Sequence, residues 1–172
     1  MNKKLAKRAE ETLRRLDPLI RHIRSVQENA LVLGEKLIKN GNIELGHKLI
    51  ANSFIHDNSK FFSPEFEELT DNQVADNESS KLKFKMALSS HLSKNMHHPE
   101  FWVGGIKEMN LVYLLELLCD WKARSEQFGS SLIEYINGPA MKRFDFDKND
   151  EVYKTLIKYH DLLCEKPFVE NK

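Results

Sequence analysis

The sequence His56-Asp57-Asn58-Ser59-Lys60 lies between a predicted helix and a short loop that leads into Pro64. A histidine followed directly by an aspartate places an imidazole and a carboxylate on one backbone turn, and both groups are metal ligands. Because a carboxylate has two oxygens, Asp57 can bridge two metal ions, whereas His56 can hold one. An adjacent His-Asp pair is common by chance, so its meaning depends on the partners that the rest of the chain supplies.

The helix before this pair is predicted over about residues 43–57. Leu45, Leu49 and His56 fall on one face, so His56 continues an inward stripe. His47 is half a turn out of phase with His56 and is predicted at the surface. The spacing therefore separates a candidate ligand from a surface histidine within one helix.

An earlier helix is predicted from Asp17-Pro18, a typical N-cap and first helical position, to Asn40. His22 lies at the edge of its apolar stripe and is predicted to face the interior. Residues 1–17 are read as a separate, basic, surface helix.

Further histidines follow the His-Asp pair. A helix predicted over about 80–96 carries His91 and Asn95 on its inward stripe. The segment His97-His98-Pro99 comes next, and Pro99 should end the helix and hold His98 in an extended conformation.

The most apolar helix is predicted over residues 106–128, and it carries Glu116 and Asp120 on one face. A carboxylate on the inner face of such a helix costs several kcal/mol unless it is paired. An arginine or lysine can pair it, but a metal ion satisfies histidine and aspartate together. His160, like His47, does not fit the inward pattern.

Composition is that of an ordinary globular protein. The 172 residues contain 26 Lys+Arg and 26 Asp+Glu, so the net charge gives no argument for a nucleic-acid partner. No apolar run is long enough to cross a bilayer, no signal peptide is visible, and two cysteines do not form a disulfide framework. We expect a cytoplasmic protein.

No segment shows convincing strand alternation, so the predicted fold is an all-α, single-domain helical bundle of about six to eight helices. A metal-site core is expected over 18–128 and C-terminal helices over 129–172. In the latter region, a short helix at 131–137 should end at Gly138-Pro139, a loop should cover 140–149, and a last helix 150–164.

The order of a single histidine, a His-Asp pair, further histidines and a late aspartate resembles the HD superfamily of metal-dependent phosphohydrolases. More narrowly, HDNSKFFSPEF (56–66), HLSKNMHHPEFW (91–102) and LLELLCDWKARS (114–125) resemble an uncharacterised family of small HD-like proteins of bacteria and phages. The resemblance covers about residues 18–125.

This resemblance implies a helical bundle whose metal ligands come from separate helices. It assigns one metal to His22, His56, Asp57 and Asp120. The additional histidines imply a second metal, bridged by Asp57 and held by His91 and one or both of His97 and His98. A single-metal site that uses only the first four residues remains open, and the metal is one or two divalent ions among Mn, Fe, Ni, Co, Zn and Mg.

Lys60 departs from the mononuclear HD nucleotidases, which often carry a glutamate at that place. The form His-Asp-x-x-Lys is similar to multinuclear HD enzymes, including cyclic-dinucleotide phosphodiesterases and di-iron oxygenases. Other hallmark residues of those phosphodiesterases are absent.

The favoured prediction is a phosphohydrolase in which a metal lowers the pKa of water toward about 7. Lys60 would neutralise phosphate oxygens, Glu100 or Glu116 would move a proton to the leaving group, and Asn95 would bind phosphate or a ligand. Glu116 can equally orient a metal ligand, because it lies one turn before Asp120.

Two alternatives stay open: a di-iron oxygenase on the same ligands, and a non-catalytic, metal-stabilised helical binding protein. The expected partner of the favoured function is a small phosphorylated molecule, with nucleotides among the candidates. Neither a membrane nor a nucleic acid is expected, and a homo-oligomer is left open.

Overall fold

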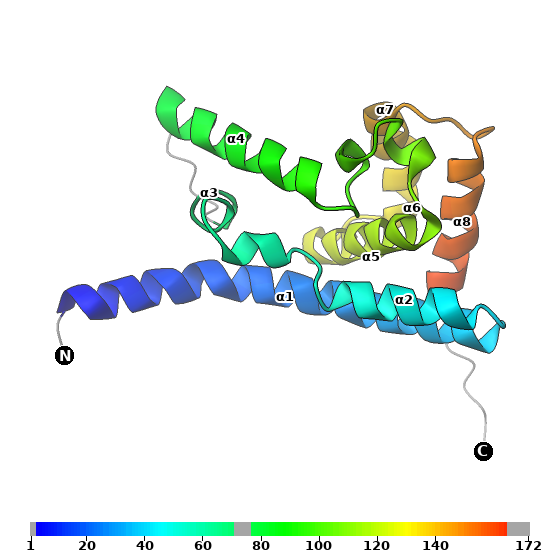
Figure 1. Cartoon of the computed structure of the whole chain (residues 1–172), viewed down its shortest axis with the longest axis horizontal. Coiled ribbons are helices and arrows are strands. Elements are labelled where there is room, and N and C mark those ends of the chain that lie inside the picture. Colours follow the sequence, from blue (N-terminus) through cyan, green and yellow to red (C-terminus); the bar gives the residue numbers. More distant parts are fainter. Residues whose placement is uncertain (1–2, 71–76, 165–172) are drawn as a thin grey trace, which may run out of the picture.

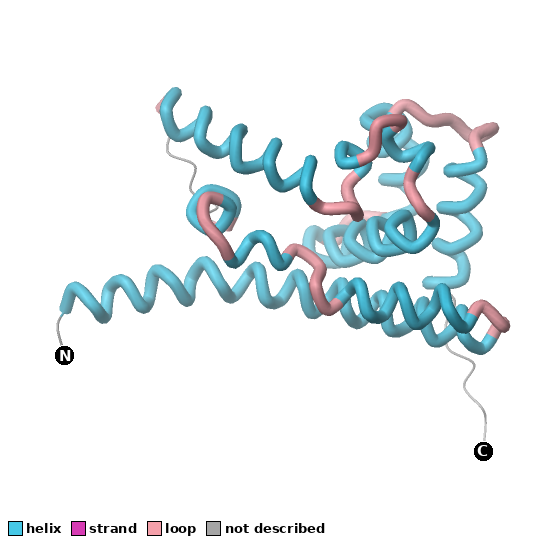
Figure 2. The backbone as a smooth tube through the Cα atoms, in the orientation of Figure 1, coloured by secondary structure: helices cyan, strands magenta, loops and turns pink. Residues whose placement is uncertain are grey.

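Helices joined by short loops form the fold, and no strand occurs among residues 3–70 and 77–164, the part of the chain that the computed structural model describes (Figure 2). The expected all-α bundle is confirmed. Residues 1–2, 71–76 and 165–172 of the expected single domain lie outside this description. None of the described helices combines the length and apolar character that crossing a bilayer requires.

The longest helix, α1 (Lys3–Lys39), runs along one side of the molecule (Figure 1). The separate helix start predicted at Asp17-Pro18 is wrong, because Pro18 lies inside α1. A proline inside a helix removes one backbone hydrogen bond and crowds the preceding turn. The apolar stripe that begins at Leu19 and includes Val26 is buried against the rest of the bundle. This packing stabilises the helix on the C-terminal side of Pro18, so the helix continues across the proline.

Helix α2 (Ile43–Ser53) packs against the C-terminal half of α1 (Figure 1). Two glycines make this approach close, since a Cβ atom built at Gly46 would lie 2.5 Å from the carbonyl oxygen of Gly34. Any side chain at Gly46 would therefore push the two backbones apart. Because His22 lies on α1 and His56 follows α2, this contact sets the distance between the two histidines.

The chain turns sharply after α2. The helix ends at Ser53 and not near residue 57 as predicted, and Asp57 adopts a left-handed conformation with φ 55°. Aspartate tolerates this conformation better than most residues. The turn exposes Phe54 and Ile55 but buries His56 and Asp57. His56 is buried as expected, although it lies beyond the helix whose periodicity predicted it.

A 3-10 helix (Asn58–Phe61) and the short α3 (Glu65–Leu69) lead to α4 (Glu78–Lys94), which lies within two residues of its predicted bounds. His98 is extended, with φ −99° and ψ 135°, as its position before Pro99 predicts. Two further 3-10 helices (Pro99–Phe101 and Gly105–Glu108) connect α4 to the next long helix.

Helix α5 (Leu111–Phe128) is the central element and contacts α1, α2 and α8. Its turns between Leu114 and Trp121 are buried all round, as its apolar sequence predicts. It begins five residues later than expected, because Gly105–Glu108 forms a separate 3-10 helix.

The C-terminal region closes the other side of α5. The predicted break at Gly138-Pro139 is wrong, since α6 (Leu132–Tyr135) continues through a π-turn (Ile136–Ala140) into α7 (Met141–Phe144). The apolar residues on both sides of the π-turn, Ile136 and Ala140, are completely buried, so packing holds the segment helical. The last helix, α8 (Glu151–Cys164), lies where it was predicted, and both cysteines are free.

Candidate metal centre

The predicted metal ligands come from α1, the turn after α2, α4, the segment after α4, and α5, and they lie together in the interior. The imidazole centroids of His56 and His97 are 4.2 Å apart, and those of His22 and His56 are 5.7 Å apart. The cluster consists of His22, His56, Asp57, His91, His97, His98 and Asp120. Six of these side chains are buried, and His98 is half-buried.

Asp57 lies at the middle of the cluster, and its two oxygens face different histidines. Oδ2 lies 3.7 Å from Nε2 of His22 and 3.8 Å from Nε2 of His56. Oδ1 lies 3.1 Å from Nε2 of His91 and 3.6 Å from Nε2 of His97. One carboxylate thus separates the histidines into two groups.

The first group is completed by Asp120, whose Oδ1 lies 3.0 Å from Nε2 of His22. Ligand atoms of His22, His56 and Asp120 all lie within 4.8 Å of one another. Two ligands of one ion, each at about 2.1 Å from it, are separated by about 3 to 4 Å. The spacing of this group therefore fits a single metal ion.

The second group comprises Asp57, His91, His97 and His98, whose ligand atoms also lie within 4.8 Å of one another. Nε2 of His98 faces Nε2 of His91 at 2.9 Å. Burial lowers the pKa of His98 to about 2, and nearby imidazoles contribute to this shift. His98 is thus neutral, the form in which histidine binds metals. Both histidines of the adjacent pair, His97 and His98, therefore belong to this group.

Outer hydrogen bonds fix which nitrogen each imidazole presents. Nδ1 of His56 donates to Oε1 of Glu116 (3.0 Å), and Nδ1 of His91 donates to Oε2 of Glu65 (2.8 Å). In the neutral imidazoles, these bonds leave each Nε2 without a proton and directed toward Asp57. Glu116 also lies 3.4 Å from Nδ1 of His97, so one carboxylate orients two imidazoles.

His56, His97 and Glu116 also lie close enough together to count as a metal-binding group. We assign these contacts to hydrogen bonds, because the 3.0 Å distance between His56 and Glu116 is that of an N–H···O bond.

The orphaned polar atoms coincide with the candidate ligand atoms. Among the described side chains, the buried nitrogens and oxygens without a hydrogen-bond partner are Nδ1 and Nε2 of His22, Nε2 of His56, Oδ1 of Asp57, Nε2 of His97 and Oδ1 of Asp120. Buried polar groups are nearly always satisfied, and each exception requires an explanation. Cations between these nitrogens and oxygens would satisfy five of the six atoms, so the donor set fits a metal.

Both candidate carboxylates are held in their charged forms. Burial opposes the charge of Asp57, but neighbouring His56 and Lys60 outweigh it and lower the pKa of this carboxyl. Burial likewise opposes the charge of Asp120, and the close approach of His22 (3.0 Å) together with the nearby His56 outweighs it, so this pKa is also lowered. The same carboxylates raise the pKa of His56 against the effect of its own burial. The cluster is therefore rich in negative charge that a cation can balance.

Two residues of this outer arrangement were not predicted from the sequence, Glu65 and Ser59. Ser59 donates from Oγ to Oε2 of Glu65 (2.6 Å), which in turn holds His91. Asn95 donates to Oγ of Ser59 (3.1 Å) and to the carbonyl oxygen of His91 (2.7 Å). Asn95 therefore contacts the supports of a ligand. The sequence around Ser63-Pro64-Glu65 reads only as the start of a helix and carries no signal for this role.

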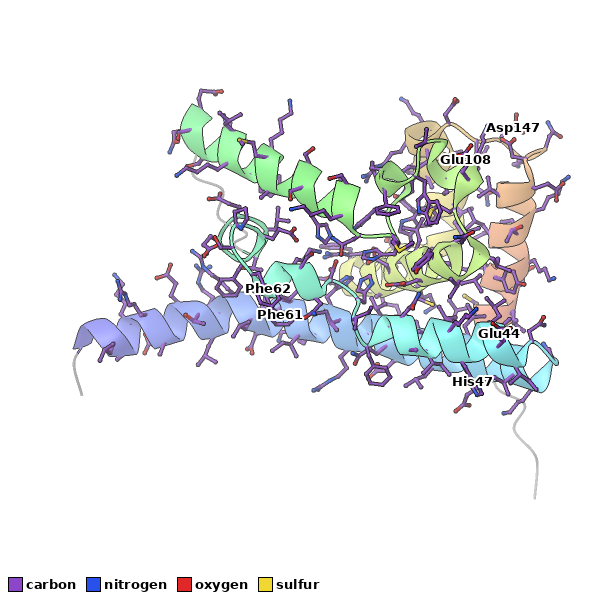
Figure 3. The ribbon with its side chains drawn as sticks, in the orientation of Figure 1. Glu44, His47, Phe61, Phe62, Glu108 and Asp147 are labelled. Carbon is purple, nitrogen blue, oxygen red and sulfur yellow. The ribbon has the colours of Figure 1, made fainter. Side chains whose placement is uncertain are left out.

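The remaining predicted catalytic residues occupy different environments. Nζ of Lys60 lies 2.5 Å from Oδ2 of Asp57, next to the cluster. Glu116 is buried behind the imidazoles. Glu100 is exposed and pairs with Arg143 at 3.0 Å. His47 is exposed on the outer surface of α2 (Figure 3), and His160 is half-buried on α8 with its Nδ1 3.0 Å from Oδ1 of Asp161, outside the cluster.

A cavity of about 440 Å³ opens beside the cluster, and His91, His98 and Asp120 lie in its wall. Three cationic side chains, Lys60, Arg124 and Arg143, line the same cavity. Nε of Arg124 lies 4.0 Å from Oδ1 of Asp120, but the arginine is 44% exposed. Asp120 is therefore not enclosed by an arginine in a dry interior, which was the main alternative to a metal.

Comparison with known proteins gives a family and no function. No curated protein and no solved structure matches the chain. A family model, described as a family of unknown function (DUF5662), matches residues 11–163, which include every residue of the cluster and both of its supporting glutamates. The chain belongs to this family of unknown function.

Proposed function

We propose that this protein is a metal-dependent phosphohydrolase of the HD type with two metal sites that share Asp57. The observation that supports it most is the division of the Asp57 carboxylate, with Oδ1 3.1 Å from His91 and Oδ2 3.7 Å from His22. A carboxylate between two histidine groups is typical of sites in which two metals act on one phosphate.

The first site would use two neutral imidazoles and two carboxylates from the chain, and the second three neutral imidazoles and one carboxylate. His22, His56 and Asp120 would hold one ion, and His91, His97 and His98 the other, with Asp57 bound to both. When bound, the ions supply a water of lowered pKa as nucleophile and withdraw charge from the phosphate. Imidazole and carboxylate ligands suit Mn, Fe, Ni, Co and Zn, and Mg less well.

The cations of the cavity support phosphate as the reacting group. Lys60 and Arg124 each contact a carboxylate of the cluster, at 2.5 Å from Asp57 and 4.0 Å from Asp120. Both also line the cavity, so they can neutralise phosphate oxygens from two sides. An oxygenase acting on an uncharged substrate would not need this pair.

The two glutamates predicted to transfer a proton, Glu116 and Glu100, occupy different environments. Glu116 is occupied by the hydrogen bond from His56, so we assign it to holding the imidazoles in place. Glu100 does not line the cavity, although its partner Arg143 does, so proton transfer by Glu100 stays a prediction. A cytoplasmic location and a homo-oligomer remain predictions.

The test begins with the protein purified without added metal, followed by elemental analysis and a screen of phosphate esters with Mn²⁺, Ni²⁺, Co²⁺ and Mg²⁺. We expect about two ions per chain at saturation and metal-dependent cleavage of a phosphate ester bond. Iron with substrate-dependent oxygen uptake would instead support the oxygenase. Bound metal without turnover across a broad screen would support a structural role.

A further inference from the structure

The wall that carries Lys60 and Arg124 has a cavity on each side. The first is the 440 Å³ cavity already described, which we call the aromatic cavity. The second, of about 240 Å³, contains His22 and is called the His22 cavity. Both cavities are lined by Lys60, Leu69, Arg124 and Phe128, so the two spaces adjoin along this wall.

Each cavity reaches a different part of the metal centre. The aromatic cavity reaches His91 and His98 of the second ligand group and Asp120 of the first, whereas the other cavity reaches His22 of the first group and no ligand of the second. Lys60 lines both cavities and its Nζ lies 2.5 Å from Oδ2 of Asp57, so the boundary between the two cavities lies beside the carboxylate that separates the two ligand groups. A phosphate held there by Lys60 and Arg124 would have open space in two directions.

The two spaces differ in chemistry. In the aromatic cavity, the rings of Trp121 and Phe144 lie parallel at 5.7 Å with an interplanar angle of 18°, and Tyr135 stands beside Trp121 at 5.1 Å. Such a wall suits a flat ring. The His22 cavity has polar side chains at Thr70 and Gln127 and a cationic one at Arg15, so it suits a polar substituent.

We infer from these paired cavities that the substrate is a phosphodiester, with a ring-bearing substituent in the aromatic cavity and a polar one in the His22 cavity. The inference rests on the proposed phosphohydrolase function. A phosphate monoester has one organic substituent and would leave the second cavity unused. In the reaction, the oxygen of water bonds to phosphorus and one P–O ester bond breaks. The departing oxygen takes a proton, so the products are a monoester and an alcohol.

The test compares p-nitrophenyl thymidine 5′-phosphate, a diester with a nitrophenyl ring on one side and a polar deoxynucleoside on the other, with p-nitrophenyl phosphate, using the full chain loaded with Mn²⁺. We expect kcat/KM for the diester to exceed that for the monoester about tenfold, a ratio that differential binding in a pocket can supply. The variant Gln127→Trp fills the His22 cavity from its exposed rim and should lower this ratio about tenfold.

Two variants serve as controls. Gln127→Ala removes the 3.3 Å contact with Arg124 without filling the cavity, and it should keep the preference for the diester. His47→Trp adds an indole on α2, outside both cavities, and should leave the ratio unchanged. Circular dichroism and metal content confirm that each variant is folded and loaded.

The outcomes separate the inference from the function on which it rests. Monoester turnover that equals or exceeds diester turnover, or a diester preference that Gln127→Trp leaves intact, overturns the inference and leaves a phosphohydrolase. Metal-loaded protein that hydrolyses neither of these esters nor any member of the phosphate-ester screen overturns the proposed function, and the inference with it.

Discussion

Nε2 of His22 lies 3.0 Å from Oδ1 of Asp120, although the first residue belongs to α1 and the second to the central helix α5. Both atoms are buried, and neither has a hydrogen-bond partner in the described chain. An imidazole nitrogen and a carboxylate oxygen in this position are either a bare ion pair or two ligands of one cation. The other ligand atoms around them favour the cation.

The variant Asp57→Ala should lose both metal ions, because the Asp57 carboxylate faces the Nε2 atoms of both sets of histidines. Elemental analysis should show loss of most bound metal, and turnover should disappear with it. We also expect a lower melting temperature, since the histidines around Asp57 would keep buried, unsatisfied nitrogens. His47→Ala, on the exposed face of α2, should change none of these. Equal losses in both variants would refute the assignment of Asp57.

The variants His22→Ala and His91→Ala should each remove a different ion. His22 contacts Asp120 and Oδ2 of Asp57, whereas His91 contacts Oδ1 of Asp57. Metal titration followed by calorimetry should show one retained binding event in each single variant and none in the double variant. If either single variant abolished all binding, a single ion shared by all the ligands would be the better description.

The variant Glu65→Gln tests a support that only the structure reveals. Replacing the carboxylate weakens the 2.8 Å hydrogen bond to Nδ1 of His91, and loss of such a support lowers metal affinity by about 10- to 100-fold. Competition with a chelator measures the change. Glu67→Gln, on the same short helix but exposed, is the matched control. If the two variants bound the metal with equal affinity, Glu65 would not support the metal site and would serve only at the start of α3.

The sequence predicted most of the ligands correctly because errors in the predicted helix ends do not change which face of a long helix is buried. His22, His91 and Asp120 sit on helices whose inward stripes are several turns long, so periodicity alone indicates the buried face. His56 is buried by a left-handed turn at Asp57 and not by the helix that was expected to carry it. The burial of His56 was therefore predicted correctly, although the helix used to predict it ends before His56.

Glu65 and Ser59 lie in a region where no periodicity applies. They flank the turn and loop before α3, and their contacts with His91 depend on how α4 crosses over that loop. Tertiary placement of this kind has no signature in one sequence. Pro18 and Pro139 led to the opposite error, since helix boundaries were predicted there and both residues lie inside helical segments. Packing of the buried residues outweighed the local preference of proline to end a helix.

The variant Arg124→Gln should weaken substrate binding without removing metal. Arg124 lines both cavities and is 44% exposed, and its nearest carboxylate is 4.0 Å away at Asp120. Loss of one charged hydrogen bond to phosphate should raise KM about tenfold. The difference in KM between Arg124→Gln and the wild type should become smaller at higher salt concentration. Lys148→Gln, exposed beyond the cavities, is the control, and loss of metal from Arg124→Gln would instead mark a structural role.

The variant Gly46→Ala tests the closeness of α1 and α2. Its Cβ would lie 2.5 Å from the carbonyl oxygen of Gly34, a backbone atom that cannot move without shifting a helix. Overpacking of this kind costs about 1 to 3 kcal/mol of the free energy of unfolding, measurable by urea denaturation. Because the shift would also separate His22 from His56, the affinity for the first ion should fall as well. Gly138→Ala, where a Cβ meets nothing within 4 Å, should not lose stability. If Gly46→Ala were as stable as Gly138→Ala, the close approach would not be what sets the spacing of the two histidines.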